Sequence, residues 1–338
     1  MSEPDRSCGL VLPADDEGIA RAIEALRAGL PVAFPTETVY GLGADAANAA
    51  AVAAIYRIKR RPRDHPLIVH VADADALGFW AETGGRARAL VEAFWPGPLT
   101  LILPRRAQAP AHACAGQPTI GLRCPSHPVA KSLLAGFAAG GGQGVAAPSA
   151  NRFGKVSPTR AEHVLADLDG DVPLILDGGD AEIGLESTIV DLSAGRPRLL
   201  RPGAITGSAL AEALGEPIGG AEPAAPRVPG SLAAHYAPGT PVELVDASQL
   251  ADRIADLRRL GRRLAVWSRE PQLAGGVEWL AAPADPRDYG RMLYDGLRRL
   301  DRLGVDRLLI ETVPAGEAWD AIRDRLGRAA TGSGGRGD

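Results

Sequence analysis

The segment from Gly215 to Pro241 constrains the fold more than any other, because its Gly, Pro and Ala residues favour neither helices nor strands. It reads GEPIGGAEPAAPRVPGSLAAHYAPGTP, which predicts an extended connection without regular structure. A chain of 338 residues is also long enough for about two domains. We therefore predict four regions: a large domain at residues 10–212, a linker at 213–240, a small domain at 241–330 and a disordered tail at 331–338.

The large region combines many short β-rich runs with few helices. Helical spacing of apolar residues predicts helices at residues 15–29, 46–60, 85–94, 127–137 and 160–168. Strands are predicted at PVAF, LIVHV, TLILP, TIGLR, GVAAP, PLILDGG, STIVDLS and RLLRPG, and PTETVYGLG (35–43) is predicted as a polar loop. This balance predicts an α/β domain with a twisted, mixed sheet covered by helices.

Beyond the linker, strand and helix patterns alternate regularly. The runs PVELV, RLAVWS, VEWLA and RLLIE are separated by helical patterns near residues 248–260, 286–303 and 316–327. Such alternation predicts a small parallel α/β domain.

Charge and cysteine content exclude several classes of protein. The formal net charge is −4, so a surface that attracts nucleic acid or anionic membranes as a whole is not expected. No apolar run reaches the roughly 18 residues of a membrane helix, and the polar N-terminus lacks the pattern of a signal peptide. Three cysteines without CxxC spacing and six histidines without HExxH indicate a reducing, cytoplasmic setting, with no zinc site.

The densest chemical signal is RIKRRPRDHPLIVH, in which five basic residues fall between Arg57 and Arg63. One interpretation is a solvated basic helix end, where the helix dipole favours cations. The other follows from Pro62, which ends the helix and leads into LIVHV, so that Lys59 and Arg61 would face phosphates at the mouth of a sheet. His70 ends that strand pattern, and the alternation of the strand directs it toward a cleft.

Two further clusters follow predicted strands. APSANRFGKVSPT supplies Ser149, Asn151 and Ser157, whose hydroxyl, amide and backbone N–H groups suit phosphate oxygens. A turn followed by a helix cap is the alternative interpretation. Arg123 and Arg201 each close a strand pattern before a proline, which favours their convergence on one cleft.

These motifs occur together and in the order seen in one family. PTETVYGLG, the Lys59–Arg61 pair with RPxxHPL, PSAN, ESTIVD, RPG and the HYAP of the linker resemble the long, two-domain threonylcarbamoyl-AMP synthases of the YrdC-like family. The resemblance implies a YrdC-like domain with a basic cavity, a linker that reaches over the active site and a smaller Rossmann-like domain. It also implies an L-threonylcarbamoyladenylate synthase that uses ATP, L-threonine and bicarbonate, with Mg²⁺ carried by ATP rather than held by protein ligands.

The resemblance also assigns roles to residues by matching position. Lys59 and Arg61 are expected to be catalytic. The residues expected to bind ATP are Lys59, Arg61, Thr119, Ser149, Asn151, Ser157, Arg201, His235 and Tyr236. Those expected to bind L-threonine are Thr36, Thr38, His70, Arg123 and Ser187. The linker lacks a Lys or Arg between its Pro-Gly and HYAP, which removes the cation expected in that stretch.

The chemistry agrees with this assignment. A carbamate formed from threonine and CO₂ is already an anionic nucleophile, so positioning and charge neutralisation suffice. The product would pass to a downstream tRNA threonylcarbamoyl transferase, without stable nucleic-acid binding by this chain. The rival interpretations are an RNA-binding YrdC-like module without adenylate synthesis, and an enzyme of the same fold that takes carbamoyl phosphate.

Overall fold

A computed structural model describes residues 9–168, 170–222, 224–272 and 275–334. Its contacts divide the chain into two compact units. The large unit runs to Ser231, apart from two short segments, 154–157 and 183–185. Those segments belong to the small unit, which otherwise begins at Leu232. The predicted linker is thereby divided, because residues 213–231 belong to the large unit and residues 232–240 to the small one.

The large unit is built on a ten-stranded sheet in the order β1-β8-β2-β3-β7-β4-β6-β5-β9-β10. Parallel and antiparallel neighbours both occur, which confirms the predicted mixed sheet. The strands are β1 (Leu10–Pro13), β2 (Val32–Phe34), β3 (Gly41–Asp45), β4 (Ile68–His70), β5 (Leu99–Pro104), β6 (Thr119–Arg123), β7 (Val145–Ala146), β8 (Leu174–Asp177), β9 (Thr188–Asp191) and β10 (Arg198–Arg201).

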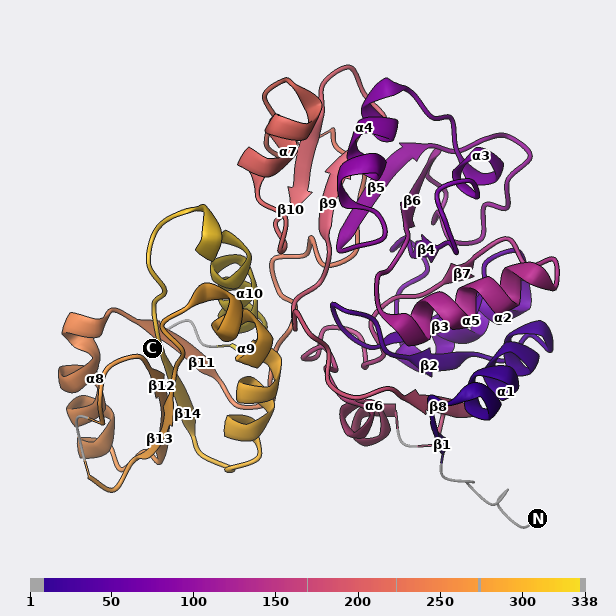
Figure 1. The fold of residues 1–338 in the computed structure, drawn as a ribbon. Helices are drawn as coiled ribbons and strands as arrows, with labels where there is room; N and C mark the ends of the chain where they lie inside the picture. Colours follow the sequence, from indigo (N-terminus) through magenta and orange to yellow (C-terminus); the bar gives the residue numbers. More distant parts are fainter. Residues whose placement is uncertain (1–8, 169, 223, 273–274, 335–338) are drawn as a thin grey trace, which may run out of the picture. The chain divides into compact units, whose positions relative to one another are not determined.

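Helices cover both faces of this sheet (Figure 1). Neighbouring residues of one strand enter different cores: Val32 and Phe34 of β2 pack on one face, and Ala33 packs on the other. This alternation is the period of a strand buried on both sides. The helices are α1 (Asp16–Arg27), α2 (Ala49–Lys59), α3 (Leu77–Trp80), α4 (Gly85–Phe94), α5 (Pro128–Ala139), α6 (Ala161–Leu168) and α7 (Gly207–Leu214).

The boundaries of α2 fix the position of the basic cluster. Asn48 caps the helix, since its side chain accepts hydrogen bonds from the backbone N–H groups of Ala50 and Ala51. At the other end Arg60 adopts a left-handed conformation with φ of 53°, which ends the helix directly after Lys59. Lys59 therefore stands in the last helical turn, where the chain turns toward β4.

The small unit contains a four-stranded sheet in the order β11-β14-β12-β13, and every pairing in it is parallel. This arrangement confirms the predicted parallel α/β domain. Its elements are β11 (Val242–Val245), α8 (Ala247–Arg259), β12 (Leu264–Ser268), β13 (Glu278–Ala281), α9 (Pro286–Asp301), β14 (Arg307–Glu311), the 3₁₀ turn η1 (Glu317–Trp319) and α10 (Asp320–Gly332).

Several features differ from the sequence prediction. β1, α3 and α7 were not predicted, and β3 occupies part of the segment predicted as a loop. α10 continues to Gly332, so the predicted disordered tail begins too early, while residues 335–338 lie outside the described part of the chain. Among the described residues, no helix is long and apolar enough to cross a membrane.

Candidate active site

Lys59 joins two of the predicted clusters. Its side chain is 2% exposed, and Nζ donates hydrogen bonds of 2.5 Å to the backbone carbonyls of Ser149 and Asn151. Burial, together with the nearby Arg61 guanidinium, holds the pKa of Lys59 well below its usual range. A phosphate beside Nζ would favour the charged form, so anion binding and protonation of Lys59 would support each other.

Arg61 is the second buried cation of the basic cluster. Its Nη2 donates to the Pro66 carbonyl at 2.9 Å, and its guanidinium lies 5.4 Å from the centre of the Phe153 ring. The remaining basic side chains of the cluster are exposed: Arg57, Arg60 and Arg63. The structure thus divides the cluster into two buried cations and three exposed ones at a solvated helix end, and phosphate binding by the buried pair stays a prediction.

His70 and Arg123 are adjacent across two strands. They are register partners at the ends of the parallel strands β4 and β6, and both are buried. Burial and the positive charge of Arg123 lower the pKa of His70 to about 3, so the imidazole is neutral near pH 7. His70 Nδ1 has no hydrogen-bond partner among the described residues.

The loop after β2 brings an acidic side chain to this pair. Glu37 Oε1 lies 2.7 Å from Arg123 Nη2, and the two side chains are 2% and 5% exposed. On either side of Glu37, the hydroxyls of Thr36 and Thr38 are 2.8 Å apart, and Thr36 also donates to the Val39 carbonyl at 2.6 Å. Arg123 therefore contacts a carboxylate that sequence reasoning left unassigned, and Thr36 and Thr38 flank that residue in the loop.

Ser187 and Arg201 form a third group. Arg201 Nη2 donates to the hydroxyl of Ser187 at 3.0 Å and to its carbonyl at 2.8 Å. The Ser187 hydroxyl also lies 2.7 Å from that of Thr100 on β5. Arg201 Nη1 donates to the carbonyl of Pro229 at 2.9 Å, which ties this group to the first part of the linker.

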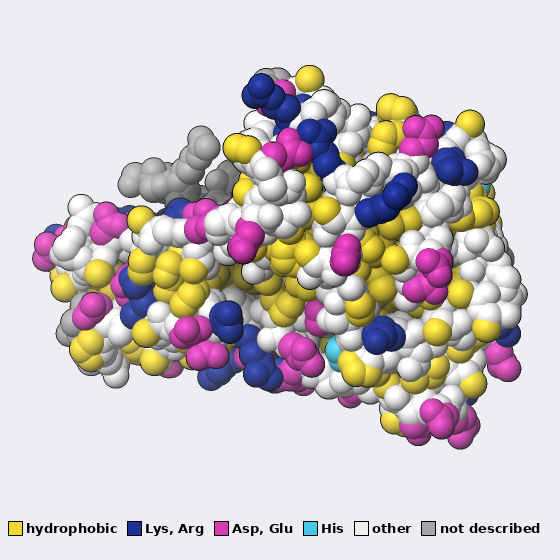
Figure 2. All heavy atoms as spheres, turned by 45° about the horizontal axis from the view of Figure 1, so that its top comes forward, with side chains coloured by type: hydrophobic (Ala, Val, Ile, Leu, Met, Phe, Trp, Pro, Cys, Tyr) yellow, Lys and Arg dark blue, Asp and Glu magenta, His cyan; other side chains and the backbone are white. Residues whose placement is uncertain are grey.

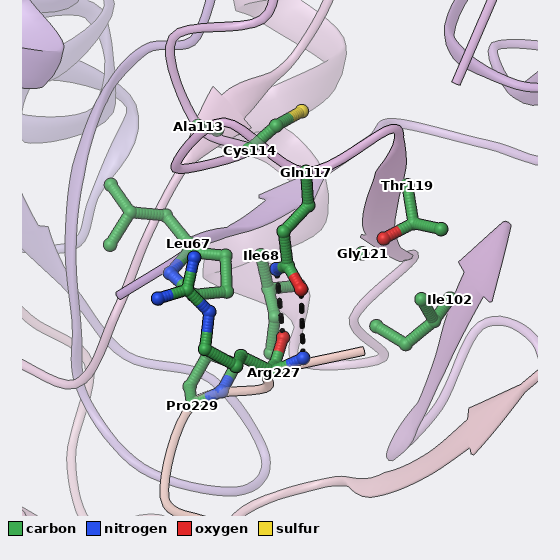
Figure 3. Close-up of a pocket in the computed structure, with 11 residues that line it drawn as sticks. Leu67, Ile68, Ile102, Ala113, Cys114, Gln117, Thr119, Gly121, Arg227 and Pro229 are labelled. Atoms are coloured by element: carbon green, nitrogen blue, oxygen red, sulfur yellow. Dashed lines mark hydrogen bonds between the residues drawn. The ribbon is translucent and has the colours of Figure 1, made fainter. Parts of the chain in front are cut away.

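A small pocket connects Thr119 with the same linker segment (Figure 3). Its lining includes Thr119, Pro66, Pro229 and Arg227. Gln117 holds the linker there through two hydrogen bonds: its Oε1 accepts from Arg227 N at 2.8 Å, and its Nε2 donates to Arg227 O at 3.1 Å (Figure 3). Since Arg61 donates to Pro66 and Arg201 to Pro229, this pocket adjoins both cation groups.

The last three predicted ATP residues belong to the small unit. Ser157 lies in the segment 154–157, whose Val156 carbonyl accepts a hydrogen bond from Arg298. Tyr236 is 1% exposed, with φ of 59°, and its ring is 5.6 Å from that of Tyr294 and 5.3 Å from the Arg325 guanidinium. His235 packs on Tyr236, with ring centres 4.2 Å apart.

Figure 2 shows basic and acidic side chains of the described residues intermixed on one face of the molecule, so that face is neither uniformly positive nor uniformly negative. This agrees with the formal net charge of −4. Any attraction for anions must therefore be local, and Lys59, Arg61 and Arg201 are buried cations that we expect to supply it.

Sequence reasoning missed three contributors to the site. Glu37 was overlooked although it separates two threonines assigned to the amino-acid pocket, a position that itself pointed to it. The two hydrogen bonds between the Gln117 side chain and the Arg227 backbone join residues far apart in sequence, so no local sequence pattern predicts them. Arg227 also supplies a linker cation, but just before the Pro-Gly rather than after it.

Comparisons with known proteins cover nearly the whole chain. Residues 24–203 match the family described as "Telomere recombination", and residues 205–331 match the "Threonylcarbamoyl-AMP synthase, C-terminal domain". The threonylcarbamoyl-AMP synthase of Bacillus subtilis (strain 168) is 40% identical over 334 residues, with 95% of each chain covered.

Solved structures of similar proteins agree with the fold. A double-alanine variant of Sua5 from P. abyssi superposes with a TM-score of 0.89 at 34% identity, covering 96% of this chain and 97% of the other. The same P. abyssi protein complexed with L-threonine gives a TM-score of 0.86 at 36% identity, with the same coverage. The chain therefore belongs to the family of two-domain threonylcarbamoyl-AMP synthases.

Proposed function

We propose that this chain makes L-threonylcarbamoyladenylate and pyrophosphate from L-threonine, bicarbonate or CO₂, and ATP, as the activated precursor of threonylcarbamoyladenosine in tRNA. The observation that carries the proposal is the pairing of two kinds of group in the large unit. Buried Lys59 bonds the carbonyls of Ser149 and Asn151, and buried Arg123 pairs with Glu37 beside its strand neighbour His70. Membership of the family supplies the reaction that these groups fit.

The reaction needs no nucleophile from the protein. The ammonium of bound threonine first loses a proton, and the neutral amine then adds to CO₂ and loses a second proton, which gives a carbamate. A carbamate oxygen then forms a bond to the α-phosphorus of ATP, and the bond from that phosphorus to the bridging oxygen of pyrophosphate breaks. Catalysis is then mostly the alignment of two anions and the neutralisation of their charge.

Each buried cation has a role that follows from its position. Lys59 and Arg61 bind the phosphates and stabilise the charge that develops on pyrophosphate, because a dry site strengthens such contacts. Ser149 and Asn151 orient the nucleotide together with Lys59, to which their carbonyls are bonded. Arg201 completes the nucleotide side, and its bond to the Pro229 carbonyl links nucleotide binding to the linker.

The amino-acid side is built from neutral hydroxyls and one guanidinium. Arg123 suits the threonine carboxylate, because a guanidinium grips a carboxylate through two parallel hydrogen bonds. Thr36, Thr38 and Ser187 offer hydroxyls that can exchange their mutual bonds for bonds to substrate. Neutral His70 can accept or donate one hydrogen bond at its unpartnered Nδ1.

Mg²⁺ enters this proposal as the companion of ATP. Among the described residues, no group of three or more His, Cys, Asp or Glu side chains could hold a metal ion. Oxygen atoms of the triphosphate are ligands that Mg²⁺ prefers. When bound there, the ion adds positive charge next to that of Lys59 and Arg61.

The product determines the partner. A carbamoyl adenylate is a reactive mixed anhydride, so a transferase that carries it to tRNA must act downstream. ATP, bicarbonate and tRNA meet in the cytoplasm, which is the location that we propose for this chain.

The test is to incubate the purified full chain with ATP, bicarbonate and each amino acid in turn, and to measure pyrophosphate and adenylate product by mass spectrometry. We expect stoichiometric pyrophosphate and threonylcarbamoyl-AMP with threonine, without RNA. Turnover that requires carbamoyl phosphate would establish the related carbamoyl-transfer enzyme instead. Tight tRNA binding without pyrophosphate release would establish an RNA-binding module.

A further inference from the structure

Glu37 is a buried carboxylate that has no role in the reaction proposed above. Its side chain is 2% exposed, and its Oε1 lies within ion-pair distance of Arg123 Nη2. Neither oxygen accepts a hydrogen bond of good geometry from the described residues, and the backbone N–H groups of Glu37 and Ser126 are only weakly placed donors that help to lower its pKa. A buried carboxylate with incomplete hydrogen bonding is costly to keep, so its retention calls for an explanation.

Glu37 is ionised when the site is empty. Burial by itself would raise the pKa of the carboxyl, but the Arg123 guanidinium outweighs this, and the net pKa is lowered. The loop therefore presents a negative charge, held beside the guanidinium that we assign to the threonine carboxylate.

The five predicted threonine-binding residues lack a partner for the substrate ammonium. Thr36, Thr38 and Ser187 are neutral hydroxyls, His70 is held neutral by its pKa of about 3, and Arg123 is a cation. An α-amino acid is a zwitterion, so a buried pocket that holds it needs one charge of each sign. Glu37 is the acidic side chain that contacts this group.

We propose that Glu37 binds the ammonium of L-threonine while Arg123 binds its carboxylate, so that the zwitterion takes its place against the Glu37–Arg123 ion pair. This inference rests on the proposed function, since it deepens the assignment of the threonine pocket. In the empty site the two side chains satisfy each other's charge. The incoming amino acid replaces that contact with one partner for each of its own charges.

The proposal also gives Glu37 a role in substrate choice. A hydroxy acid or other carboxylate without an ammonium can neutralise Arg123 but leaves Glu37 buried and unpaired. Such a ligand must break the ion pair without restoring the charge balance. Glu37 therefore selects amino acids against simple carboxylates.

The test compares two ligands that differ in the amine, L-threonine and 3-hydroxybutyrate. Dissociation constants are measured by titration calorimetry for the full chain and for Glu37→Gln, with exposed Glu92→Gln as the matched control. We expect Glu37→Gln to weaken threonine binding at least tenfold and to leave 3-hydroxybutyrate binding unchanged or tighter. The control should shift neither constant.

Equal weakening of both ligands by Glu37→Gln would show that Glu37 only shapes the pocket, and no change in either would show that it is not involved. Each result overturns the inference while leaving the proposed function intact. If the unaltered chain fails to bind threonine at all, the proposed function fails and this inference falls with it. Retained ATP binding reports folding. If Glu37→Gln does not fold, Glu37→Asp, which withdraws the charge by one methylene, should weaken threonine alone.

Discussion

Both units contain cationic side chains near the ends of strands, but the groups that accept hydrogen bonds from these cations differ. In the small unit, Arg269 follows β12 and bonds the buried carboxylate of Glu311, which also accepts from Ser268 Oγ at 2.6 Å and from Arg269 N at 2.7 Å. In the large unit, the ammonium of Lys59 donates to the backbone carbonyls of Ser149 and Asn151. A carbonyl dipole orients a cation without cancelling its charge.

This difference shows which strand ends can take an anionic substrate. A guanidinium already bonded to a carboxylate braces the fold, and a new anion must compete for it. The carbonyls that accept from Lys59 orient its ammonium without cancelling its charge. Arg123 is intermediate, since its partner Glu37 has incomplete hydrogen bonding and can be exchanged. Arg198 on β10 is also paired with a buried carboxylate, that of Asp191, although it lies in the large unit. The partner of each cation, rather than the unit to which it belongs, therefore indicates whether it can take an anion.

The largest expected effect concerns the amino-acid pocket. We expect α-aminobutyrate, which lacks only the hydroxyl of threonine, to react up to about 10⁴-fold less efficiently than threonine. Without that hydroxyl, buried polar groups of the pocket are left unpaired. Serine lacks a methyl group, so it should lose only about 1–3 kcal/mol of transition-state binding. The measurement is kcat/KM for pyrophosphate release with each amino acid. Equal values for threonine and α-aminobutyrate would remove the hydroxyls of Thr38 and Ser187 and the imidazole of His70 from the pocket.

The next prediction compares the loss of kcat when a buried cation is replaced in the large unit with the loss when one is replaced in the small unit. Lys59→Met or Arg61→Met should lower kcat for adenylate formation about 10²–10³-fold, because each removes a charge-assisted contact from a dry site. The matched variant Arg269→Met should reduce stability while leaving kcat within about threefold of the original, since its partner is structural. Pyrophosphate release and thermal unfolding are measured for all three.

Near-normal turnover in Lys59→Met or Arg61→Met would place those residues outside the reaction. A large loss of turnover in folded Arg269→Met would show that Arg269 itself takes part in the chemistry, and its contrast with Lys59 and Arg61 would then fail.

The fold was predictable wherever a pattern is local. The apolar spacing and Pro62 predicted a helix at 46–60, which is observed as α2 at Ala49–Lys59, and the strand–helix alternation after Pro241 predicted the parallel small sheet. β1 was not predictable in this way, because it is a short and partly exposed strand whose pairing with β8 joins residues far apart in sequence. Local patterns do not carry such pairings.

The site was predictable to the extent that residue type and strand ends indicate it. The basic run before a proline did not by itself distinguish Lys59 and Arg61 from the exposed Arg57, Arg60 and Arg63, and the family resemblance singled out the two. The ion pair of Arg123 with Glu37 was invisible, since it forms between a loop and a strand distant in sequence. The site roles themselves remain predictions until the variants are measured.

A smaller effect is expected from the neutral state of His70. Its pKa of about 3 in the folded protein is below the value of about 6.5 for an exposed histidine. Between these values the unfolded chain binds a proton that the folded chain does not, so stability falls as the pH falls from about 6.5 toward 3. We expect His70→Gln to flatten the pH dependence by up to about 1.4 kcal/mol of unfolding free energy per pH unit.

Urea unfolding between pH 6.5 and 4.5 gives this slope, and the exposed His112→Gln serves as control. Because the slope is compared, a change in overall stability caused by the substitution does not disturb the result. An identical slope in His70→Gln and the unaltered chain would mean that His70 is protonated in the folded protein.

The smallest expected effect concerns the linker, whose two parts belong to different units. Gln117 clasps Arg227 on the large unit, while Tyr236 packs against Tyr294 and Arg325 in the small one. We predict that the linker closes over the nucleotide and keeps water from the mixed anhydride. Gln117→Ala removes two hydrogen bonds, each worth about 1 kcal/mol, and should slow turnover a few-fold.

Tyr236→Ala should act in the same direction, because either change loosens one attachment of the same segment. The informative quantity is intact adenylate released per pyrophosphate formed, since a looser lid lets water consume product before release. We expect both variants to give slower turnover and a lower ratio, whereas truncation after Gly215 should impair catalysis more than it impairs folding of the large unit. If both variants and the truncated chain match the original in rate and ratio, the linker only tethers the two units. A fall in the ratio for Gln117→Ala alone would restrict the lid to the segment that carries Arg227 and Pro229.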